Sequence, residues 1–202
     1  MSTVALNLET DTVVLPEPAM PATARLQQAL SRRRSTRTFH PDPLSMGTLS
    51  ALLWSAFGIN RADSRGRTAP SAHNWQEIDV FAVLPEGAYR YDARGNRLLL
   101  VNAEDLRAAT GTQDFVANAP LNLVYVADFA RMHGAKPDER AFLAGADAGC
   151  IAQNVYLYAA SSGLATVIRA WIDRDAIANA LGLSHDQQVL LSQTVGYPKA
   201  VA

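Results

Sequence analysis

Three arginines and three hydroxyl side chains fall within seven consecutive residues, Arg33-Arg34-Ser35-Thr36-Arg37-Thr38-Phe39. In an extended backbone alternate side chains point the same way, which would place Ser35 between the guanidinium groups of Arg33 and Arg37. Guanidinium groups bind phosphate in a bidentate, charge-assisted geometry, and a serine hydroxyl can donate to a further oxygen. The stretch therefore predicts a site for a phosphate monoester. The alternative is a set of cations at the C-terminal end of a helix, because Leu26 and Leu30 lie one helical turn apart just before it.

The overall charge of the chain indicates that the arginine cluster is a local feature. Lysine and arginine number 18 against 19 aspartates and glutamates, which gives a formal net charge of -1. Domains that bind nucleic acid usually carry a clear basic excess, so we expect no nucleic-acid partner. The 202 residues, 49% of them hydrophobic, are enough for one domain with a sizeable core. We expect an N-terminal arm over residues 1–21 and a single domain over residues 22–202.

Nothing in the sequence indicates an exported, membrane-bound or metal-binding protein. The single cysteine, Cys150, allows no intrachain disulfide, and the first twenty residues lack the basic and apolar regions of a secretory signal. The apolar runs are shorter than the roughly 20 residues of a membrane span. We therefore expect a cytoplasmic protein with no membrane partner. No histidine, cysteine or acidic residue lies at metal-ligand spacing around His73, so we expect no metal site.

A second polar motif, Pro70-Ser71-Ala72-His73-Asn74-Trp75-Gln76, leads into a strand-like segment from Ile78 to Leu84. If the motif is extended, Asn74 and Gln76 share a face. Each carboxamide offers a donor and an acceptor, which suits a ring edge that alternates carbonyl and N–H groups, such as the pyrimidine edge of a flavin. The alternative is an ordinary polar loop that caps a strand.

Periodicity and turn signals predict an α+β fold in which helices and strands do not alternate strictly. No G-x-G-x-x-G motif follows a strand, so a dinucleotide-binding Rossmann domain is not supported. An extended arm is predicted from Thr3 to Val14, with loops over 60–68 and 129–138 and a short helix capped by Asn102. The predicted helices run from Pro21 or Ala22 to Arg33, from the Ser45 cap to Gly58, from Glu139 to Ser162, and from the Asp173 cap to Gly182. The predicted strands are Ile78 to Leu84, Tyr89 to Tyr91, Leu98 to Val101, Leu121 to Asp128, Ala165 to Ile172, and Gln188 to Val195.

The long helix predicted from Glu139 carries a stripe of small residues. These are Ala141, Ala144, Gly145, Ala148, Gly149 and Ala152. Small residues let helices approach closely, which fits a helix packed against its own copy across a two-fold axis. A helix in the core of one chain is the equally compatible alternative. Cys150 on the same helix is predicted to be a small packing residue.

Together these motifs resemble the nitroreductase family, the FMN-dependent homodimeric oxidoreductases. The arginine stretch resembles the family's first flavin-binding motif, and residues 70–76 resemble its Pro-Ser-Ser-x-Asn-x-Gln pattern. Residues 163–171 and 195–198 resemble its later helix-to-strand junction and terminal strand. Residues 49–59 resemble the branch of azoline-forming dehydrogenases of peptide maturation. The resemblance implies a nitroreductase-like fold, with a central mostly antiparallel sheet flanked by helices and a long central helix at a dimer interface.

The resemblance also implies a role for individual residues. Arg33 and Ser35 would hold the FMN phosphate, and Arg37 would reach the N1 and C2 carbonyl edge of the ring, where reduction places negative charge. The segment from Ser71 to Gln76 would line the ribityl and pyrimidine side, and the backbone around residues 168–171 would pass the flavin N5. Because the flavin carries the chemistry, no catalytic side chain is expected. The full set of cofactor-binding residues implied is Arg33, Arg34, Ser35, Arg37, Pro70, Ser71, Ala72, His73, Asn74, Gln76, Ile168, Arg169, Ala170, Trp171 and Lys199.

The sequence departs from the family pattern at a few positions. Ala72 replaces a serine, Glu77 stands where proline is usual, and Ala170-Trp171 replaces the common acidic-glycine pair beside N5. Many members continue into a basic tail, which Lys199 would replace in part.

The activity implied is transfer of hydride from NAD(P)H, through flavin N5, to a small electron-poor acceptor such as a quinone or nitroaromatic. Two alternatives stay open. One is a flavin-dependent dehydrogenase of a heterocyclic or peptide-derived substrate that is re-oxidised by oxygen, and the other is a flavin-binding protein without turnover.

Overall fold

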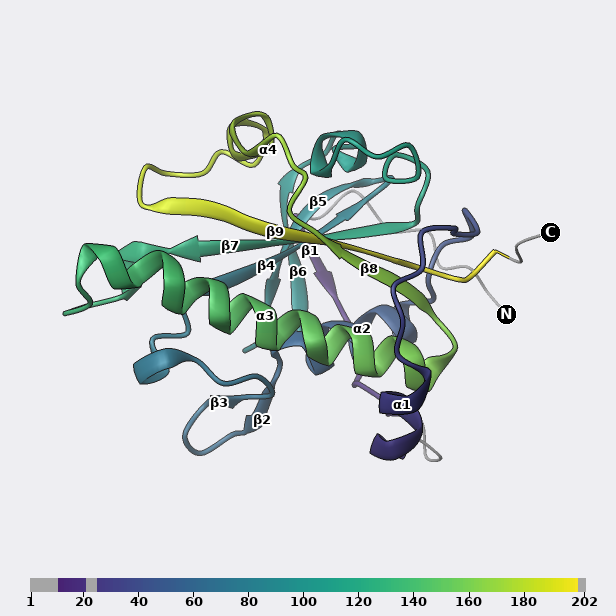
Figure 1. The fold of residues 1–202 in the computed structure, drawn as a ribbon, viewed down its shortest axis with the longest axis horizontal. Coiled ribbons are helices and arrows are strands. Elements are labelled where there is room, and N and C mark those ends of the chain that lie inside the picture. The colour runs from purple at the N-terminus through teal and green to yellow at the C-terminus, as the bar shows by residue number, and fades with distance from the viewer. Residues whose placement is uncertain (1–10, 21–24, 200–202) are drawn as a thin grey trace.

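A seven-stranded sheet forms the centre of the molecule (Figure 1). The computed structural model describes residues 11–20 and 25–199. The strand order is β1-β6-β5-β4-β7-β9-β8, and every neighbouring pair is antiparallel. The strands are β1 (Thr12–Val14), β4 (Ile78–Leu84), β5 (Gly87–Asp92), β6 (Arg97–Asn102), β7 (Leu121–Asp128), β8 (Ala165–Arg169) and β9 (Gln187–Gly196). A separate hairpin consists of β2 (Ile59–Arg61) and β3 (Gly66–Arg67).

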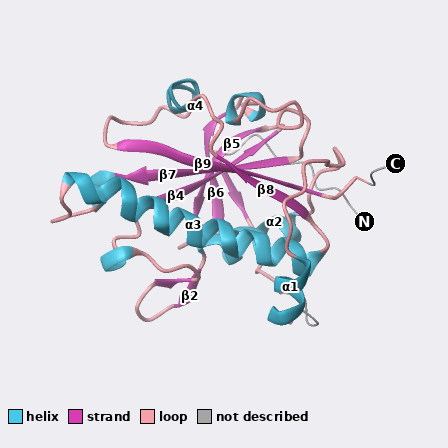
Figure 2. Cartoon of the chain, in the orientation of Figure 1, coloured by secondary structure: helices cyan, strands magenta, loops and turns pink. Residues whose placement is uncertain are grey.

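Helices cover both faces of the sheet (Figure 2). The α-helices are α1 (Leu26–Arg32), α2 (Met46–Phe57), α3 (Pro137–Ser162) and α4 (Arg174–Ala180), and the 3₁₀ turns are η1 (Ala72–Asn74), η2 (Arg107–Thr110) and η3 (Phe129–Arg131). Helices α2 and α3 pack on one face, and α4 and η2 pack on the other. Within the described residues, no helix is both long and apolar enough to cross a membrane.

The central strands are buried on both faces because each side of the sheet has its own core. Along β4, Ile78, Val80 and Ala82 join the core under α2 and α3, while Phe81 and Val83 join the core under α4. Strand β7 divides in the same way. This arrangement confirms the prediction that the apolar segment from Leu121 to Asp128 is a strand covered on both sides.

The predicted helix ends are confirmed at three positions. The Ser45 side chain accepts a hydrogen bond from the Thr48 N–H, and the Asp173 side chain accepts one from the Ala176 N–H. Gly163 ends α3 with φ = 72°, the left-handed conformation that glycine adopts without a Cβ clash. Local capping chemistry therefore sets where these helices begin and end.

Four predicted boundaries are corrected by the structure. The predicted loop over 60–68 contains the β2–β3 hairpin, and β8 ends at Arg169 rather than Ile172. Helix α3 begins at Pro137, because proline is favourable in the first turn. The short helix predicted after Asn102 is absent from the described residues at that place: Asn102 accepts from the Glu104 N–H, but the 3₁₀ turn starts only at Arg107.

The described part of the N-terminal arm belongs to the chain's own sheet. Residues 12–14 form β1, which pairs with β6 in the register Thr12 to Leu99. The earlier part of the predicted arm, and the helix start predicted at Pro21 or Ala22, lie outside the described residues. Helix α1 follows an extended Arg25 and ends at Arg32, one residue before the predicted end.

Candidate functional site

The arginine segment leaves α1 in an extended conformation and runs beside β8. The Thr36 N–H donates to the Thr166 carbonyl at 3.0 Å, which fixes the segment to that strand. Ser35 Oγ lies 2.8 Å from the Tyr156 hydroxyl on α3, and the Arg33 guanidinium carbon lies 5.2 Å from the centroid of the same ring. Arg33 and Ser35 therefore lie on the same side of the segment, as the predicted alternation requires.

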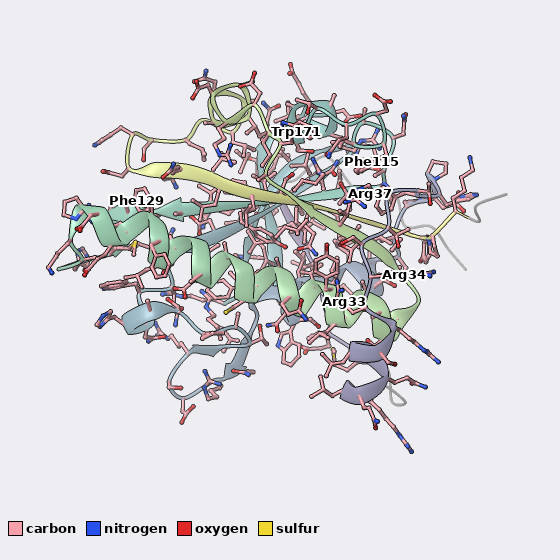
Figure 3. The ribbon with its side chains drawn as sticks, viewed as in Figure 1. Arg33, Arg34, Arg37, Phe115, Phe129 and Trp171 are labelled. Atoms are coloured by element: carbon pink, nitrogen blue, oxygen red, sulfur yellow. The ribbon has the colours of Figure 1, made fainter. Side chains whose placement is uncertain are left out.

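The charged groups of this segment are available to a ligand. Arg33, Arg34 and Arg37 are exposed, and among the described residues no carboxylate forms an ion pair with them. A cavity of about 460 Å³ opens between Arg33, Arg34 and the end of α3 at Gly163. Figure 3 shows Arg33 and Arg34 near the last turns of α3 and Arg37 farther along the segment toward Phe115. Cations are also favourable at a helix C-terminus, so this position suits arginine even without a ligand.

The end of the chain's last strand meets the same segment. Phe39 forms an isolated β-bridge with Pro198, and the Lys199 N–H donates to the Thr38 carbonyl at 3.3 Å. The ring of Phe39 also packs against Phe115, with centroids 5.5 Å apart. The structure therefore brings Lys199, which is exposed, to the arginine segment.

The segment from Ile168 to Trp171 leaves the sheet next to this place. The Ile168 N–H donates to the Tyr156 hydroxyl at 3.0 Å, so one tyrosine contacts both the arginine segment and β8. Ala170 and Trp171 lie beyond the last ladder pair, Arg169 with Ser192, and Trp171 is 73% exposed. Their backbone N–H groups are therefore outside the β8–β9 ladder.

The Arg169 side chain faces the opposite side of the sheet. It is 4% exposed, and its guanidinium donates to the Thr110 carbonyl, Asn122 Oδ1 and Thr194 Oγ1. Burial lowers the pKa of Arg169 to about 10. Gly111 leaves room for it, because a Cβ there would clash with a guanidinium nitrogen of Arg169. Arg169 can thus offer its backbone, not its side chain, to a ligand near the arginine segment.

The second motif is not extended, which corrects the prediction that Asn74 and Gln76 share a strand face. Ala72–Asn74 form a 3₁₀ turn, and φ is positive at His73 (51°), Asn74 (56°) and Gln76 (51°). The two carboxamides instead meet directly, since Gln76 Nε2 donates to Asn74 Oδ1 at 3.0 Å. Gln76 Oε1 accepts from Arg67 Nε at 2.8 Å. Some of the carboxamide donors and acceptors that were predicted to bind a ring edge therefore form hydrogen bonds within the chain instead.

Two buried carboxyl groups hold this loop. The Ala72 N–H donates to Asp147 Oδ2 at 2.7 Å, and Ser71 Oγ accepts from the Gln76 N–H while donating to Glu77 Oε2. Glu77 is fully buried. Burial, together with the negative charge of Asp147, raises the pKa of Glu77 to about 6. The loop is thus anchored to α3 and to a buried carboxyl whose pKa lies above its usual range.

The two predicted motifs line separate cavities in the described part of the chain. The first contacts α3 at Tyr156 and the second contacts it at Asp147, which are separated by roughly 14 Å at the rise of an α-helix. Asn74 and Gln76 line a different cavity, of about 890 Å³, which contains no residue of the arginine segment.

The small-residue stripe of α3 divides between the core and the surface. Ala144, Ala148 and Ala152 are buried in the subunit core. Gly149 and Cys150 are exposed, so the prediction that Cys150 is a packing residue is wrong within this chain. Phe142, about two turns of α3 before them, is 76% exposed, and added Cβ atoms at Gly145 and Gly149 would meet nothing within 4 Å.

The family is settled by sequence, since the sequence model of the nitroreductase family matches residues 30–197. The chain belongs to the nitroreductase family. A nitroreductase-family protein of Methanocaldococcus jannaschii is 31% identical over 163 residues, which are 75% of this chain and 81% of that protein. A crystal structure of a nitroreductase-family protein from Ralstonia eutropha is 44% identical and superposes with a TM-score of 0.91, covering 98% of this chain and 94% of the other. The predicted α+β nitroreductase-like fold, with its mostly antiparallel sheet and long helix, is confirmed.

The fold is also similar to a chain of the E. coli microcin synthetase McbBCD complex with truncated pro-MccB17 bound. That chain is 21% identical with a TM-score of 0.75, and the match covers 99% of this chain and 84% of the other.

Sequence reasoning missed three residues that hold the motifs of this nitroreductase-family chain. Tyr156 fixes Ser35 and Ile168, Asp147 fixes Ala72, and Arg67 fixes Gln76. Asp147 left a usable signal, because it is the only charged residue within the small-residue run of the long helix. Tyr156 and Arg67 left none, since their contacts come from packing between segments that are not neighbours in sequence.

Proposed function

We propose that this chain is an FMN-dependent oxidoreductase that transfers hydride from NAD(P)H to a small electron-poor acceptor of the quinone or nitroaromatic type. The observation that carries the proposal is the backbone hydrogen bond from Thr36 to Thr166, which holds the arginine segment beside β8, just before residues 168–171. Among the described residues, no carboxylate pairs with the guanidinium groups of this segment. Membership of the nitroreductase family supports it.

The residues present fit a flavin mononucleotide. Arg33, Arg34 and Ser35 would hold its phosphate, with Lys199 close by along the chain's last strand, because two exposed guanidinium groups that have no carboxylate partner among the described residues suit a dianion. Arg37 would stabilise negative charge at the N1 edge of the ring. When bound, FMN would supply the hydride chemistry at its N5 atom, beside the backbone of residues 168–171.

The second motif would complete the site only in a homodimer. Pro70, Ser71, Ala72, His73, Asn74 and Gln76 lie on a loop anchored at Asp147, away from the arginine segment of the same chain. The exposed face of α3, with Phe142, Gly145 and Gly149, offers a close-packing surface for a second copy. We therefore place this loop of one subunit at the flavin held by the arginine segment of the other.

Cofactor analysis and stopped-flow reduction test the proposal. Purified protein should be yellow and should release FMN rather than FAD on denaturation. Rapid bleaching of the bound flavin by NADH or NADPH, followed by re-oxidation with a quinone, is the expected behaviour. Release of FAD, or failure to take up any flavin on reconstitution, would overturn the assignment.

A second candidate is a flavin-dependent dehydrogenase of a heterocyclic or peptide-derived substrate. It is favoured by the fold similarity to a chain of the microcin synthetase complex, and by Trp171, which is exposed at the place predicted to lie beside N5. A flavin that NAD(P)H does not bleach, but that oxygen re-oxidises after reduction by such a substrate, would favour this candidate. A flavin that undergoes neither reaction would favour a non-catalytic flavin-binding protein.

A further inference from the structure

A buried arginine without a counter-ion lies at the end of β8. Arg169 is 4% exposed, and in the part of the chain that the structure describes no carboxylate forms an ion pair with it. Burial lowers the pKa of Arg169 only to about 10, so the guanidinium stays charged at neutral pH. Buried charges are ordinarily paired, because an unpaired charge is costly to remove from water. The charge of Arg169 is therefore not explained by a salt bridge.

Neutral groups hold the guanidinium of Arg169 but do not cancel its charge. It donates to the Thr110 carbonyl at 2.9 Å, to Asn122 Oδ1 at 3.1 Å and to Thr194 Oγ1 at 2.9 Å. Its Nε atom has no hydrogen-bond partner among the described residues. These acceptors fix the orientation of the guanidinium, but they carry no net charge. The positive field therefore extends into the surrounding protein, where the low dielectric constant strengthens it.

The surroundings of Arg169 include the segment that is proposed to lie beside flavin N5. Ala170 and Trp171 follow it directly and lie outside the β8–β9 ladder. The loop after η2 covers both the guanidinium and this segment. A Cβ added at Gly111 would clash with the guanidinium and would lie 3.3 Å from the Trp171 carbonyl oxygen. The uncancelled charge therefore lies directly behind the backbone of the N5 segment.

Two ring contacts connect Arg169 to the arginine segment as well. The guanidinium carbon lies 5.8 Å from the centroid of the Phe115 ring, and that ring lies 5.5 Å from the ring of Phe39. Figure 3 shows Arg37 on the part of the segment that runs toward Phe115. Arg169 thus lies behind the place where the arginine segment and the N5 segment come together.

We propose, on the basis of the FMN site proposed above, that the buried charge of Arg169 raises the reduction potential of the bound flavin. Reduction places negative charge at the N1 edge of the ring, and a fixed cation stabilises the form that carries this charge. Two unit charges about 10 Å apart, at an effective dielectric constant of about 20, change an equilibrium constant about tenfold. Arg169 would act through the protein interior, without contact with the ring.

Burial distinguishes this cation from the arginines at the proposed phosphate site. Water and dissolved salt screen the exposed charges of Arg33, Arg34 and Arg37, whereas Arg169 is shielded from both. The exposed arginines can bind a ligand directly, and the buried guanidinium is enclosed by the chain's own groups. Its charge therefore fits a role in setting the potential of the cofactor rather than in holding it.

Spectroelectrochemical titration of the flavin-loaded protein tests the proposal with two variants. Arg169→Gln removes the charge and should lower the equilibrium constant of two-electron reduction about tenfold, a fall of about 30 mV in midpoint potential. Asn122→Asp instead places a carboxylate on the same guanidinium, and the potential should fall by a similar amount. Arg174→Gln is the matched control, because it removes an exposed arginine of α4 on the same side of the sheet. It should leave the equilibrium constant within about twofold.

Three outcomes would overturn the proposal. The first is that both variants keep the native potential. The second is a fall in Arg169→Gln alone, because Asn122→Asp keeps the guanidinium in place and a purely structural role would leave its potential unchanged. The third is loss of flavin by both variants, which would make Arg169 a structural part of the site. Native protein that takes up no flavin on reconstitution would instead overturn the proposed function itself, which is a different result from these three.

Discussion

The arginine segment and the loop at residues 70–77 use their polar groups in opposite ways. The segment is held mainly by its backbone and by Tyr156, while its guanidinium groups are exposed and have no carboxylate partner in the described parts of the chain. In the loop, the side chains of Ser71, Gln76 and Glu77 bond within the chain. Changes to the first region should therefore alter ligand binding more than stability, and changes to the second should alter stability.

The largest effect is expected where the two regions are proposed to meet in the dimer. Gly149→Leu adds bulk to the exposed face of α3, where an added Cβ meets nothing within the subunit. Overpacking of a close contact typically costs 1–3 kcal/mol for each copy. The variant should lose dimer and flavin together, as measured by sedimentation velocity and flavin absorbance.

Gly47→Leu on α2 is the matched control, because its added Cβ would meet only Ser45 Oγ, at 4.0 Å. It should remain dimeric and yellow. Leucine also favours helix over glycine, so neither change should unfold the subunit. Native protein that sediments as a flavin-loaded monomer would contradict the dimeric site. A Gly149→Leu variant that remains dimeric would show that this face of α3 is not part of the interface.

The next largest effect is expected for Arg33→Ala and Arg37→Ala, which test the arginine segment alone. Each removes a charge-assisted contact to the proposed cofactor and should weaken FMN binding by roughly 1.5–3 kcal/mol, about tenfold to a hundredfold. Because neither arginine has an ion pair in the described residues, the midpoint of urea unfolding of the apoprotein should stay nearly unchanged. Dissociation constants can be measured by flavin fluorescence quenching, with Arg140→Ala as the control. Affinities that match the control would indicate that the arginines do not bind the cofactor and are only cations at the C-terminal end of a helix.

The difference between the two regions also explains what the sequence could predict. Strands β4 and β7, the Ser45 and Asp173 caps and the Gly163 stop follow from local patterns, and the structure has them at the predicted positions. The extended arginine segment follows from a similar local signal. These features need no knowledge of distant contacts.

The loop at residues 70–77 could not be predicted in the same way. Its three positive φ values, at His73, Asn74 and Gln76, accompany a hydrogen bond that the loop donates to Asp147 and one that it accepts from Arg67, and packing brings both partners to it. The sequence marks Glu77 as unusual only by comparison with a family pattern. Its burial, and the pKa that follows from it, are properties of the folded chain.

Glu77→Gln tests the loop through pH. The pKa of buried Glu77 is raised from 4.5 to about 6, so the folded state holds this proton to a higher pH than the unfolded state does. Stability from this group is therefore present below about pH 4.5, is lost as the pH rises to about 6, and stays lost above it. Glutamine can still accept from Ser71 and can donate to Asp147. The variant should be more stable than the native protein by roughly 1–2 kcal/mol at pH 8, with a smaller gain at pH 5.

Urea unfolding followed by tryptophan fluorescence at the two pH values measures this difference. Glu104→Gln is the control, since that carboxyl is exposed. A gain of the same size at both pH values would show that Glu77 stays ionised when buried.

The smallest effect is expected for Tyr156→Phe, which separates the two ways in which the arginine segment is held. The hydroxyl of Tyr156 forms a hydrogen bond with Ser35 Oγ and accepts one from the Ile168 N–H, while the Arg33 guanidinium lies over its ring. Phenylalanine keeps the ring and removes both hydrogen bonds, which should cost about 1 kcal/mol of stability. FMN affinity should fall only a few-fold, because the Thr36 to Thr166 backbone bond still fixes the segment to β8. A loss of FMN as large as that of Arg33→Ala would mean that the hydroxyl, rather than the backbone, sets the position of the guanidinium groups.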